Sequence, residues 1–161
     1  MVPSFGVDGY VLTECDDDDY FMSCILRTIL DSVDERERSL SPLWISDTEF
    51  MLREQMRSDR MLSDRFILKK GKENIGALWL AKTRDQFTCE TIGYILGIFV
   101  EYDFRGRGLG SAMIDSAGEW CTENGLIHLS LNVGSMNESA RRLYERKGFL
   151  PQSTVMRKLL K

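Results

Sequence analysis

Residues 93–110 read GYILGIFVEYDFRGRGLG and join a nearly continuous apolar run to a turn rich in glycine and arginine. The apolar part, residues 93–100, predicts a central strand that is buried on both faces. Gly97 within it predicts a bulge or a close approach of another backbone. In the turn, glycines free main-chain amides to point at an anion, a helix start adds its dipole, and Arg105 and Arg107 add positive charge. The stretch therefore predicts a strand, a pyrophosphate-binding turn and a helix, in that order.

A glycine-rich turn is weak support for an anion site when taken alone, because a tight strand-to-helix connection needs glycine as well. Spacing excludes two common nucleotide-binding loops. The dinucleotide pattern requires glycine at position 111, which is Ser111, and the pattern G-x-x-x-x-G-K-[ST] occurs nowhere in the chain.

Apolar periodicity and turn residues divide the rest of the chain into further elements. Strands are predicted at 9–15, 65–69, 75–81 and 127–133, with one or two more within 149–160, and helices at about 16–33, 46–57, 109–124 and 137–147. Four aspartates at 16–19 favour the first helix start, a capping box at 46–49 opens the second helix, and Gly125 and Gly148 end the last two. Interspersed strands and helices without a repeat predict a mixed α/β or α+β fold.

The length of 161 residues predicts one domain over residues 1–161. With 43% hydrophobic and 29% charged residues, the composition is that of a folded chain rather than a disordered one. No apolar run approaches the roughly 20 residues of a membrane span, and the first ten residues lack the basic and apolar segments of a secretion signal. We therefore expect a soluble, cytoplasmic protein without membrane contact.

The four cysteines, Cys15, Cys24, Cys89 and Cys121, are widely spaced and form no C-x-x-C pair, and His128 is the single histidine. This pattern argues against a zinc site and against a disulfide framework. We expect buried, reduced thiols and no metal.

The net charge of −4 is unevenly distributed. Residues 1–65 hold 15 acidic and 7 basic residues, whereas residues 66–161 hold 10 acidic and 14 basic ones. A basic second half suits an anionic ligand, and the acidic first half either attracts a cation or is simply a solvated surface. The overall acidity and the lack of a basic stripe interleaved with aromatics argue against nucleic acid.

Two motifs together resemble a known family. Arg105-x-x-Gly108-x-Gly110 after an apolar strand is similar to the R/Q-x-x-G-x-G/A motif of the GNAT superfamily of acyl-CoA-dependent N-acetyltransferases. The second motif is similar to that superfamily's other signature, and it consists of LNVGSMN at 131–137, Ala140, Leu143-Tyr144-Glu145 and Gly148-Phe149. The resemblance is strong over residues 93–149. It implies an α+β fold with a central mixed, mostly antiparallel sheet of about six or seven strands, splayed between strands 4 and 5 and flanked by about four helices.

The resemblance also implies how acetyl-CoA would bind as a co-substrate. Main-chain groups of Ile98, Phe99 and Val100 would pair with the pantetheine arm, which would lie between the strands at 93–100 and 127–133. The pyrophosphate would be held by the amides of Arg105, Gly106, Arg107, Gly108, Leu109 and Gly110. Asn137 matches an asparagine that contacts the cofactor arm, and it is equally compatible with a simple helix N-cap.

For catalysis, the resemblance places Tyr144 as the acid that protonates the departing CoA thiolate. A phenol suits this step because it is neutral at pH 7 and donates one hydrogen bond. The attacking amine needs a proton acceptor, for which the candidates are Glu101 first, Glu90 second, or a water chain. Asn132 stands where some members of the family have a glutamate, and it can still orient a water.

The function that follows is an N-acetyltransferase that moves an acetyl group from acetyl-CoA to a primary amine of a small molecule or peptide by direct attack in a ternary complex. The acidic first half favours a cationic acceptor. Two alternatives stay open: a non-catalytic CoA-binding regulatory module, and a nucleotide-binding α/β protein unrelated to CoA. The sequence leaves a monomer and a homodimer both open.

Overall fold

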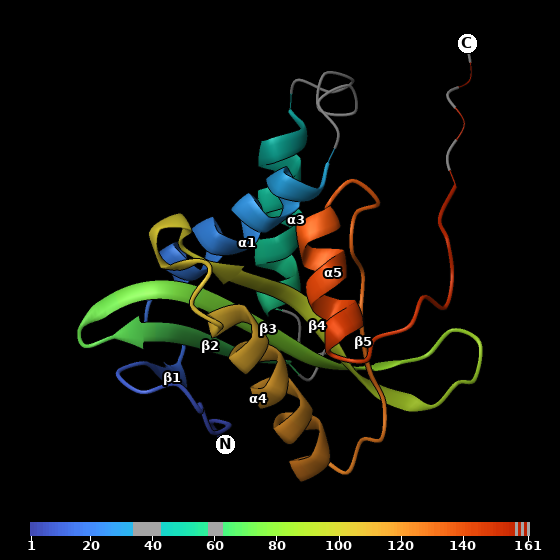
Figure 1. The fold of residues 1–161 in the computed structure, drawn as a ribbon. Helices are drawn as coiled ribbons and strands as arrows, with labels where there is room; N and C mark the ends of the chain where they lie inside the picture. Colours follow the sequence, from blue (N-terminus) through green and yellow to red (C-terminus); the bar gives the residue numbers. More distant parts are fainter. Residues whose placement is uncertain (34–42, 58–62, 157, 159, 161) are drawn as a thin grey trace.

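A five-stranded sheet organises the chain in a computed structural model that describes residues 1–33, 43–57, 63–156, 158 and 160. The strands lie in the order in which they occur along the chain (Figure 1). Their bounds are β1 Val11–Glu14, β2 Ser63–Lys70, β3 Glu73–Arg84, β4 Thr91–Val100 and β5 Leu129–Leu131. The first four strands are antiparallel to their neighbours, and β5 is parallel to β4. The strands predicted at 65–69 and 75–81 lie within β2 and β3, which form an antiparallel hairpin whose last pair is Lys70 with Glu73.

Helices pack on both faces of the sheet. They are α1 Asp18–Ser32, α3 Trp44–Arg57, α4 Leu109–Glu123 and α5 Glu138–Arg146, with a short 3-10 turn at Tyr102–Phe104. The α+β class and the four helices are as predicted. None of the helices within the described ranges is long and apolar enough to cross a membrane.

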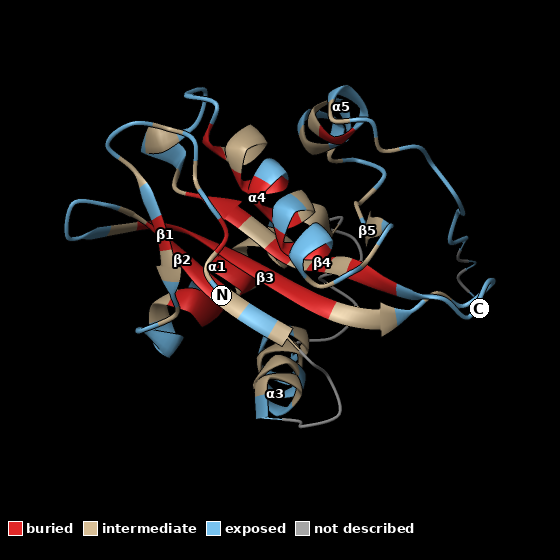
Figure 2. Ribbon diagram, turned by 90° about the horizontal axis from the view of Figure 1, so that it is seen from below, coloured by how far each residue is buried: buried red, intermediate tan, exposed pale blue. Residues whose placement is uncertain are grey.

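Alternation along the strands sends neighbouring side chains into two cores. Phe66 and Leu68 of β2 pack with α4 in one cluster, while Ile67 between them packs with α1 in the other. The same holds in β4, where Val100 faces α4 and Phe99 faces α1. Figure 2 shows this burial along the middle of β2, β3 and β4 and on the sides of α1 and α4. The central strands are therefore buried on both faces, as the apolar run at 93–100 predicts.

The expected bulge lies at Gly97. Trp79 of β3 pairs with Gly97, but the next residue, Leu80, pairs with Ile95. Leu96 therefore has no paired residue on β3 and forms the bulge. A Cβ on Gly97 would lie 2.5 Å from Ile25 Cδ1, which shows how closely α1 approaches the strand there.

The strand count is five where six or seven are expected, because the described residues after Phe149 form no strand. Leu150, Val155 and Met156 are at least 75% exposed. Pro151 cannot donate a ladder hydrogen bond, and β5, with three residues, offers only a short edge for a further strand. The strand predicted at 127–133 is likewise shorter than expected.

The capping box predicted at 46–49 does not start α3. The helix begins at Trp44, and the Ser46 hydroxyl donates to the Leu43 carbonyl at 2.8 Å inside the first turn. A serine hydroxyl in the first turn of a helix can donate to a nearby carbonyl as readily as it accepts from a free amide at the N-cap. The sequence pattern alone therefore placed the start of α3 two residues too late.

Two glycines, one inside a strand and one inside a helix, should respond in opposite ways to alanine. A Cβ on Gly76 of β3 would lie 2.5 Å from the Phe99 carbonyl oxygen, a backbone atom that cannot move aside, so Gly76→Ala should destabilise the fold by about 1–3 kcal/mol. Gly118 lies inside α4 with nothing within 4 Å of a Cβ, so Gly118→Ala should stabilise it by about 0.5–1 kcal/mol. Urea unfolding of both variants measures the two changes, and a stable Gly76→Ala protein would contradict the close β3–β4 packing.

Candidate functional site

The site is organised by a gap that opens between β4 and β5. The two strands pair at only three positions, Gly93 with Leu129, Tyr94 with Ser130 and Ile95 with Leu131. Beyond Ile95, β4 runs on to Val100, paired with β3 alone. Residues 96–100 therefore have one main-chain edge without a strand partner, next to the segment that leads from β5 into α5 (Figure 1). This is the splay that the sequence predicts between the fourth and fifth strands.

The register determines which main-chain groups reach that open edge. The Glu101 amide donates to the Ile75 carbonyl at 2.8 Å, so residue 101 faces β3. Because an antiparallel ladder alternates, Phe99 faces β3 as well, and Ile98 and Val100 direct their N–H and C=O groups to the open edge. Of the three residues predicted to pair with a pantetheine arm, two present main-chain groups and Phe99 presents its ring to α1.

The two carbonyls on the open edge already have side-chain donors. The Thr28 hydroxyl of α1 lies 3.3 Å from the Ile98 carbonyl oxygen and 3.1 Å from the Cys24 carbonyl oxygen of its own helix, so these two carbonyls share its one proton. Arg105 Nε donates to the Val100 carbonyl at 2.9 Å. The N–H groups of Ile98 and Val100 point the same way. An extended ligand with carbonyl groups is the natural partner for such an edge.

A helix start without a capping side chain follows this edge. Gly106 and Gly108 have φ values of 75° and 79°, which only glycine adopts without strain, and Gly108 is the N-cap residue of α4. The Ala112 amide makes the first intrahelical bond, to the Gly108 carbonyl at 3.0 Å, so the amides before it have no helical partner. The first turn of α4 carries no acidic residue. These amides and the helix dipole suit an anion.

The two arginines of the turn are exposed and lie against aromatic rings. The Arg105 guanidinium lies 3.9 Å from the centre of the Tyr102 ring, and its Nη2 is 3.7 Å from an Asp31 oxygen. Arg107 lies 5.1 Å from the Phe104 ring and donates to the Asp103 carbonyl at 2.9 Å. Both therefore brace the turn, and they leave their charge beside it.

Tyr144 lies on the buried face of α5, with its ring 5.7 Å from the Phe149 ring in an edge-on arrangement. Burial raises the pKa of the Tyr144 phenol, so it stays protonated at neutral pH. Asn137 is the N-cap of α5, and its side chain accepts from the Ala140 amide at 3.2 Å. A Cβ on Gly110 would lie 3.3 Å from Leu143 Cδ2, so the first turn of α4 contacts α5 next to Tyr144.

Glu101 lies at the end of β4 and is engaged by α1. Arg27 donates to both carboxylate oxygens at 2.8 Å, and the Tyr20 hydroxyl adds a third contact at 3.2 Å. These bonds from Arg27 hold the pKa of the Glu101 carboxyl below its ordinary value of 4.5, although partial burial acts in the opposite direction. Glu90 precedes Thr91, the first residue of β4, and so lies at the opposite end of the strand from Glu101. Its carboxylate oxygen is 3.4 Å from His128 Nδ1. The structure thus separates the two predicted proton acceptors along β4.

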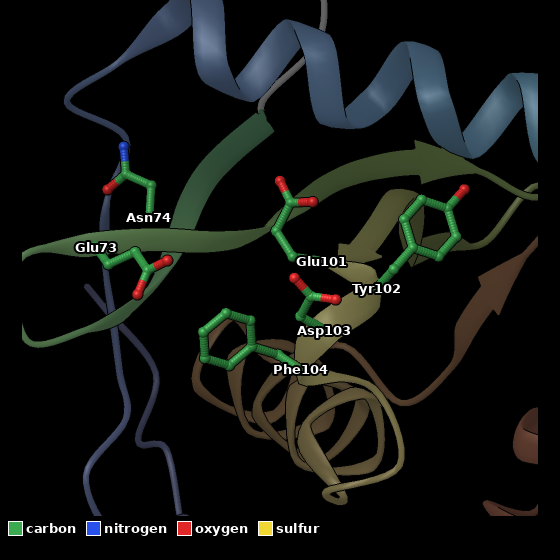
Figure 3. Close-up of a pocket in the computed structure, with 6 residues that line it drawn as sticks. All are labelled: Glu73, Asn74, Glu101, Tyr102, Asp103 and Phe104. Atoms are coloured by element: carbon green, nitrogen blue, oxygen red, sulfur yellow. The ribbon is translucent and has the colours of Figure 1, made fainter.

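A shallow cavity of about 360 Å³ adjoins the end of β4. Figure 3 shows its lining, with Glu73 and Asn74 coming from the start of β3, Phe104 and Asp103 from the turn before α4, and Glu101 directed toward α1. No group of three or more metal-binding side chains is found in the described part of the chain.

The acidic run at 16–19 is used by the fold. Asp16 pairs with Lys69 at 2.5 Å, Asp18 with Arg65 at 2.6 Å and Asp19 with Arg53 at 3.4 Å. The Asp17 side chain accepts from the Tyr20 amide at 2.9 Å and caps α1. These contacts attach the start of α1 to β2 and α3, so the acidity of this segment does not by itself indicate a cationic acceptor.

Sequence reasoning missed the polar residues of α1. Thr28, Arg27 and Asp31 contact the end of β4 and the turn that follows it. Their helical spacing with Tyr20 was available as a signal, because it marks one polar stripe beside the buried Phe21, Cys24 and Ile25.

The described residues thus bring together an open strand edge, an uncapped helix start and a buried tyrosine on the next helix. The model of the acetyltransferase (GNAT) family matches residues 29–149, and the chain belongs to this family. The uncharacterized N-acetyltransferase YycN of Bacillus subtilis is 32% identical over 89 residues, which are 55% of this chain and 56% of that protein. The matched part thus spans about half the length of this relative.

Solved structures share the fold. A putative acetyl transferase from Pyrococcus furiosus superposes with a TM-score of 0.80 at 24% identity, covering 94% of this chain and 99% of that one. The structure of AAC(6')-Iy in complex with a bisubstrate analogue, CoA-S-monomethyl-acetylneamine, has a TM-score of 0.64 at 17% identity and covers 94% and 98% of the two chains.

The Arg27–Glu101 pair should make the stability depend on pH in the acid range. The pKa of Glu101 is lower in the folded than in the unfolded chain, so its stabilisation is complete above the ordinary value of 4.5 and is lost as the pH falls through the lowered value. At pH 7, Glu101→Gln should lower the free energy of unfolding by about 1–3 kcal/mol, and the difference from wild type should shrink below pH 4.5. Urea unfolding at pH 7, 5 and 3 measures it.

Glu54→Gln, which removes an exposed pair with Arg57 on α3, is the control and should change little at any of these pH values. A deficit of Glu101→Gln that is equal at pH 7 and pH 3 would show that the ion pair is not its cause.

Proposed function

We propose that this protein is an N-acetyltransferase that transfers the acetyl group of acetyl-CoA to a primary amine of a small molecule or peptide, by direct attack in a ternary complex in the cytoplasm. The observation that carries this proposal is the continuity of the open β4 edge with the uncapped start of α4. Together they provide one track with main-chain donors for an amide-containing arm and, at its end, a site for a pyrophosphate.

On this proposal the amides of residues 106–110 hold the pyrophosphate, because the Arg105 amide already donates to the Tyr102 carbonyl at 3.2 Å. The N–H groups of Ile98 and Val100 donate to the carbonyl groups of the pantetheine arm and thioester. Phe99 supports the edge from the α1 side. Asn137 uses its side-chain oxygen to cap α5, which leaves its amide NH₂ available as a donor to the arm.

In the chemical step, the neutral amine attacks the thioester carbonyl carbon, so that a C–N bond forms and the C–S bond breaks. An open-edge N–H group stabilises the negative charge that develops on the carbonyl oxygen. Tyr144 donates its phenolic proton to the departing thiolate, and its raised pKa keeps that proton available. The proton lost by the amine leaves through water, because both oxygens of Glu101 are already bonded to Arg27.

The two buried cysteines are poorly suited to forming an acetyl-cysteine intermediate. Cys24 and Cys121 are buried, and burial raises the pKa of the Cys121 thiol to about 11 and that of Cys24 above its ordinary value. A thiol must be ionised to attack a thioester, so these groups are poor nucleophiles at neutral pH. This supports attack by the amine itself. A cationic acceptor remains a prediction from the sequence, and the sequence leaves a monomer and a homodimer both open.

Acetyl-CoA should stabilise the protein against heat. A ligand at about 100 times its dissociation constant adds roughly 2.7 kcal/mol, which should raise the unfolding midpoint of a chain of this size by about 5–10 °C. ATP and NAD at equal concentrations are the controls and should give smaller shifts. A larger shift with ATP or NAD, or none with acetyl-CoA at saturation, would mean that the turn at 105–110 binds something else or nothing.

Tyr144→Phe should lower kcat for acetylation of a good amine acceptor by about 100-fold, since a general acid contributes at least that much in many enzymes. The dissociation constant for acetyl-CoA should stay the same, because the phenol acts on the leaving group. Tyr94→Phe, which alters another half-buried tyrosine with a raised pKa, is the matched control and should keep kcat. Thiol release from acetyl-CoA with a panel of amines measures turnover.

Unchanged kcat in Tyr144→Phe would remove the acid assignment. Binding of acetyl-CoA without turnover of any amine in the panel would support a CoA-binding regulatory module instead.

A further inference from the structure

One polar stripe of α1 contacts the first part of the track described above, from the open edge of β4 to Arg105. Thr28 bonds the carbonyl of Ile98 on the open edge, and Arg27 bonds the carboxylate of Glu101 directly after that edge. One turn further along the helix, Asp31 accepts from the Tyr102 hydroxyl at 3.1 Å and pairs with Arg105. The helix therefore contacts β4 and the following turn at intervals from residue 98 to residue 105.

The Arg27–Glu101 ion pair lies in the middle of these contacts between α1 and the end of β4. Two bonds of 2.8 Å join the planar guanidinium to the carboxylate, which is the geometry that limits motion most strongly. The guanidinium also lies 4.3 Å from the centre of the Phe99 ring, so it contacts β4 on two alternate residues. Side-chain exposures of 33% and 25% place the pair partly out of water, where charge-assisted hydrogen bonds are stronger than at the surface.

The same contacts argue against proton transfer at Glu101. One carboxylate oxygen accepts from Arg27 Nη2 and from the Tyr20 hydroxyl, and the other accepts from Arg27 Nη1. A general base must receive a proton directly or through one water, in line with the reacting group. Here the carboxylate is directed toward α1 (Figure 3), while the open edge of β4 faces β5.

We propose that this stripe of α1 is a splint that fixes the acyl-CoA-binding edge of β4, and that Glu101 is a positioning residue for that edge through Arg27 rather than the proton acceptor. The proposal rests on the proposed function for its ligand. Arg27 and Glu101 hold the end of β4, Thr28 sets the orientation of the Ile98 peptide, and Asp31 holds the turn through Tyr102 and Arg105. Loss of any of these contacts loosens an edge that must be extended to pair with the arm.

The test compares Arg27→Met, Glu101→Gln and the double variant. Dissociation constants for acetyl-CoA are measured by calorimetry, and kcat is measured at saturating acetyl-CoA as a function of pH. We expect each single variant to raise the dissociation constant by about 3–10-fold and the double variant to be no worse than the singles, because the two residues act as one unit. The pH dependence of kcat should keep its wild-type midpoint in Glu101→Gln.

A proton acceptor at Glu101 gives the opposite pattern. In that case Glu101→Gln lowers kcat by 100-fold or more at saturating acetyl-CoA, leaves the dissociation constant unchanged and removes the acid limb of the pH profile, as loss of a general base does. That result overturns the proposal. Two other results also overturn it: single variants that change the dissociation constant very little, and a double variant whose fold-change equals the product of the two single-variant fold-changes.

Thr28→Val provides a variant that keeps the shape of the side chain and the ion pair. It should raise the dissociation constant by about 3-fold, in line with the loss of one hydrogen bond, and Thr28→Ser should restore the wild-type value. Thr28→Val with wild-type affinity would remove the edge contact from the proposal. Glu54→Gln, which breaks the exposed pair with Arg57 on α3, serves as the matched control and should not change the affinity.

Amide hydrogen exchange gives a readout that needs no ligand. In the unliganded protein, Arg27→Met and Glu101→Gln should speed exchange over residues 98–105 and leave the β2–β3 ladder protected. If wild type fails to bind acetyl-CoA and this local loss of protection still occurs, the proposed function fails and the splint stands. If wild type binds and exchange is unchanged in both variants, the splint fails and the proposed function stands.

Discussion

The bulge at Leu96 and Gly97 is the constraint on which the rest of the site depends. It begins at the residue after Ile95, the last position at which β4 pairs with β5. A bulge bends its strand and increases the local twist, so two strands that pair before it part after it. The parting exposes the main-chain edge of Ile98 and Val100, and it does so while β3 continues to hold the other edge of the same strand. One irregular residue thus coincides with the point at which a main-chain edge opens within the sheet.

The bulge in turn requires close support from α1. Leu96 and Gly97 both lie on the α1 side, and the absence of a side chain at Gly97 lets Ile25 pack against the strand. From that contact the helix continues along β4 with polar residues, and it reaches the turn before α4. An open edge costs stability because its peptide groups lack partners, and here side chains of Thr28 and Arg105 satisfy the two carbonyls that face outward. The carbonyls are satisfied while the N–H groups stay directed at the gap.

Particular residues show where sequence reasoning succeeded and where it could not. Gly108 and Asn137 were placed correctly at helix starts, because a left-handed N-cap and a side-chain cap are set by residues within a few positions of each other. Glu101 was the first of the candidate proton acceptors, and the sequence could not show its partner Arg27, which is 74 residues away in the chain. The aspartates at 16–19 had two open interpretations, and only the positions of Arg65 and Lys69 on β2 show that they hold the fold together.

The sequence by itself determined the family, the order of the elements, the turn that suits an anion and the helix that carries Tyr144, since each is recorded in short-range spacing and in glycines that no other residue replaces. The tertiary structure alone decided the five-strand count, the length of the gap between β4 and β5, which peptide groups of residues 98–100 face it, and which side chains brace them. The physical reason is that a strand's register and an ion pair's partner depend on how distant segments pack. A one-residue change of register would turn Ile98 and Val100 toward β3 without altering any local pattern.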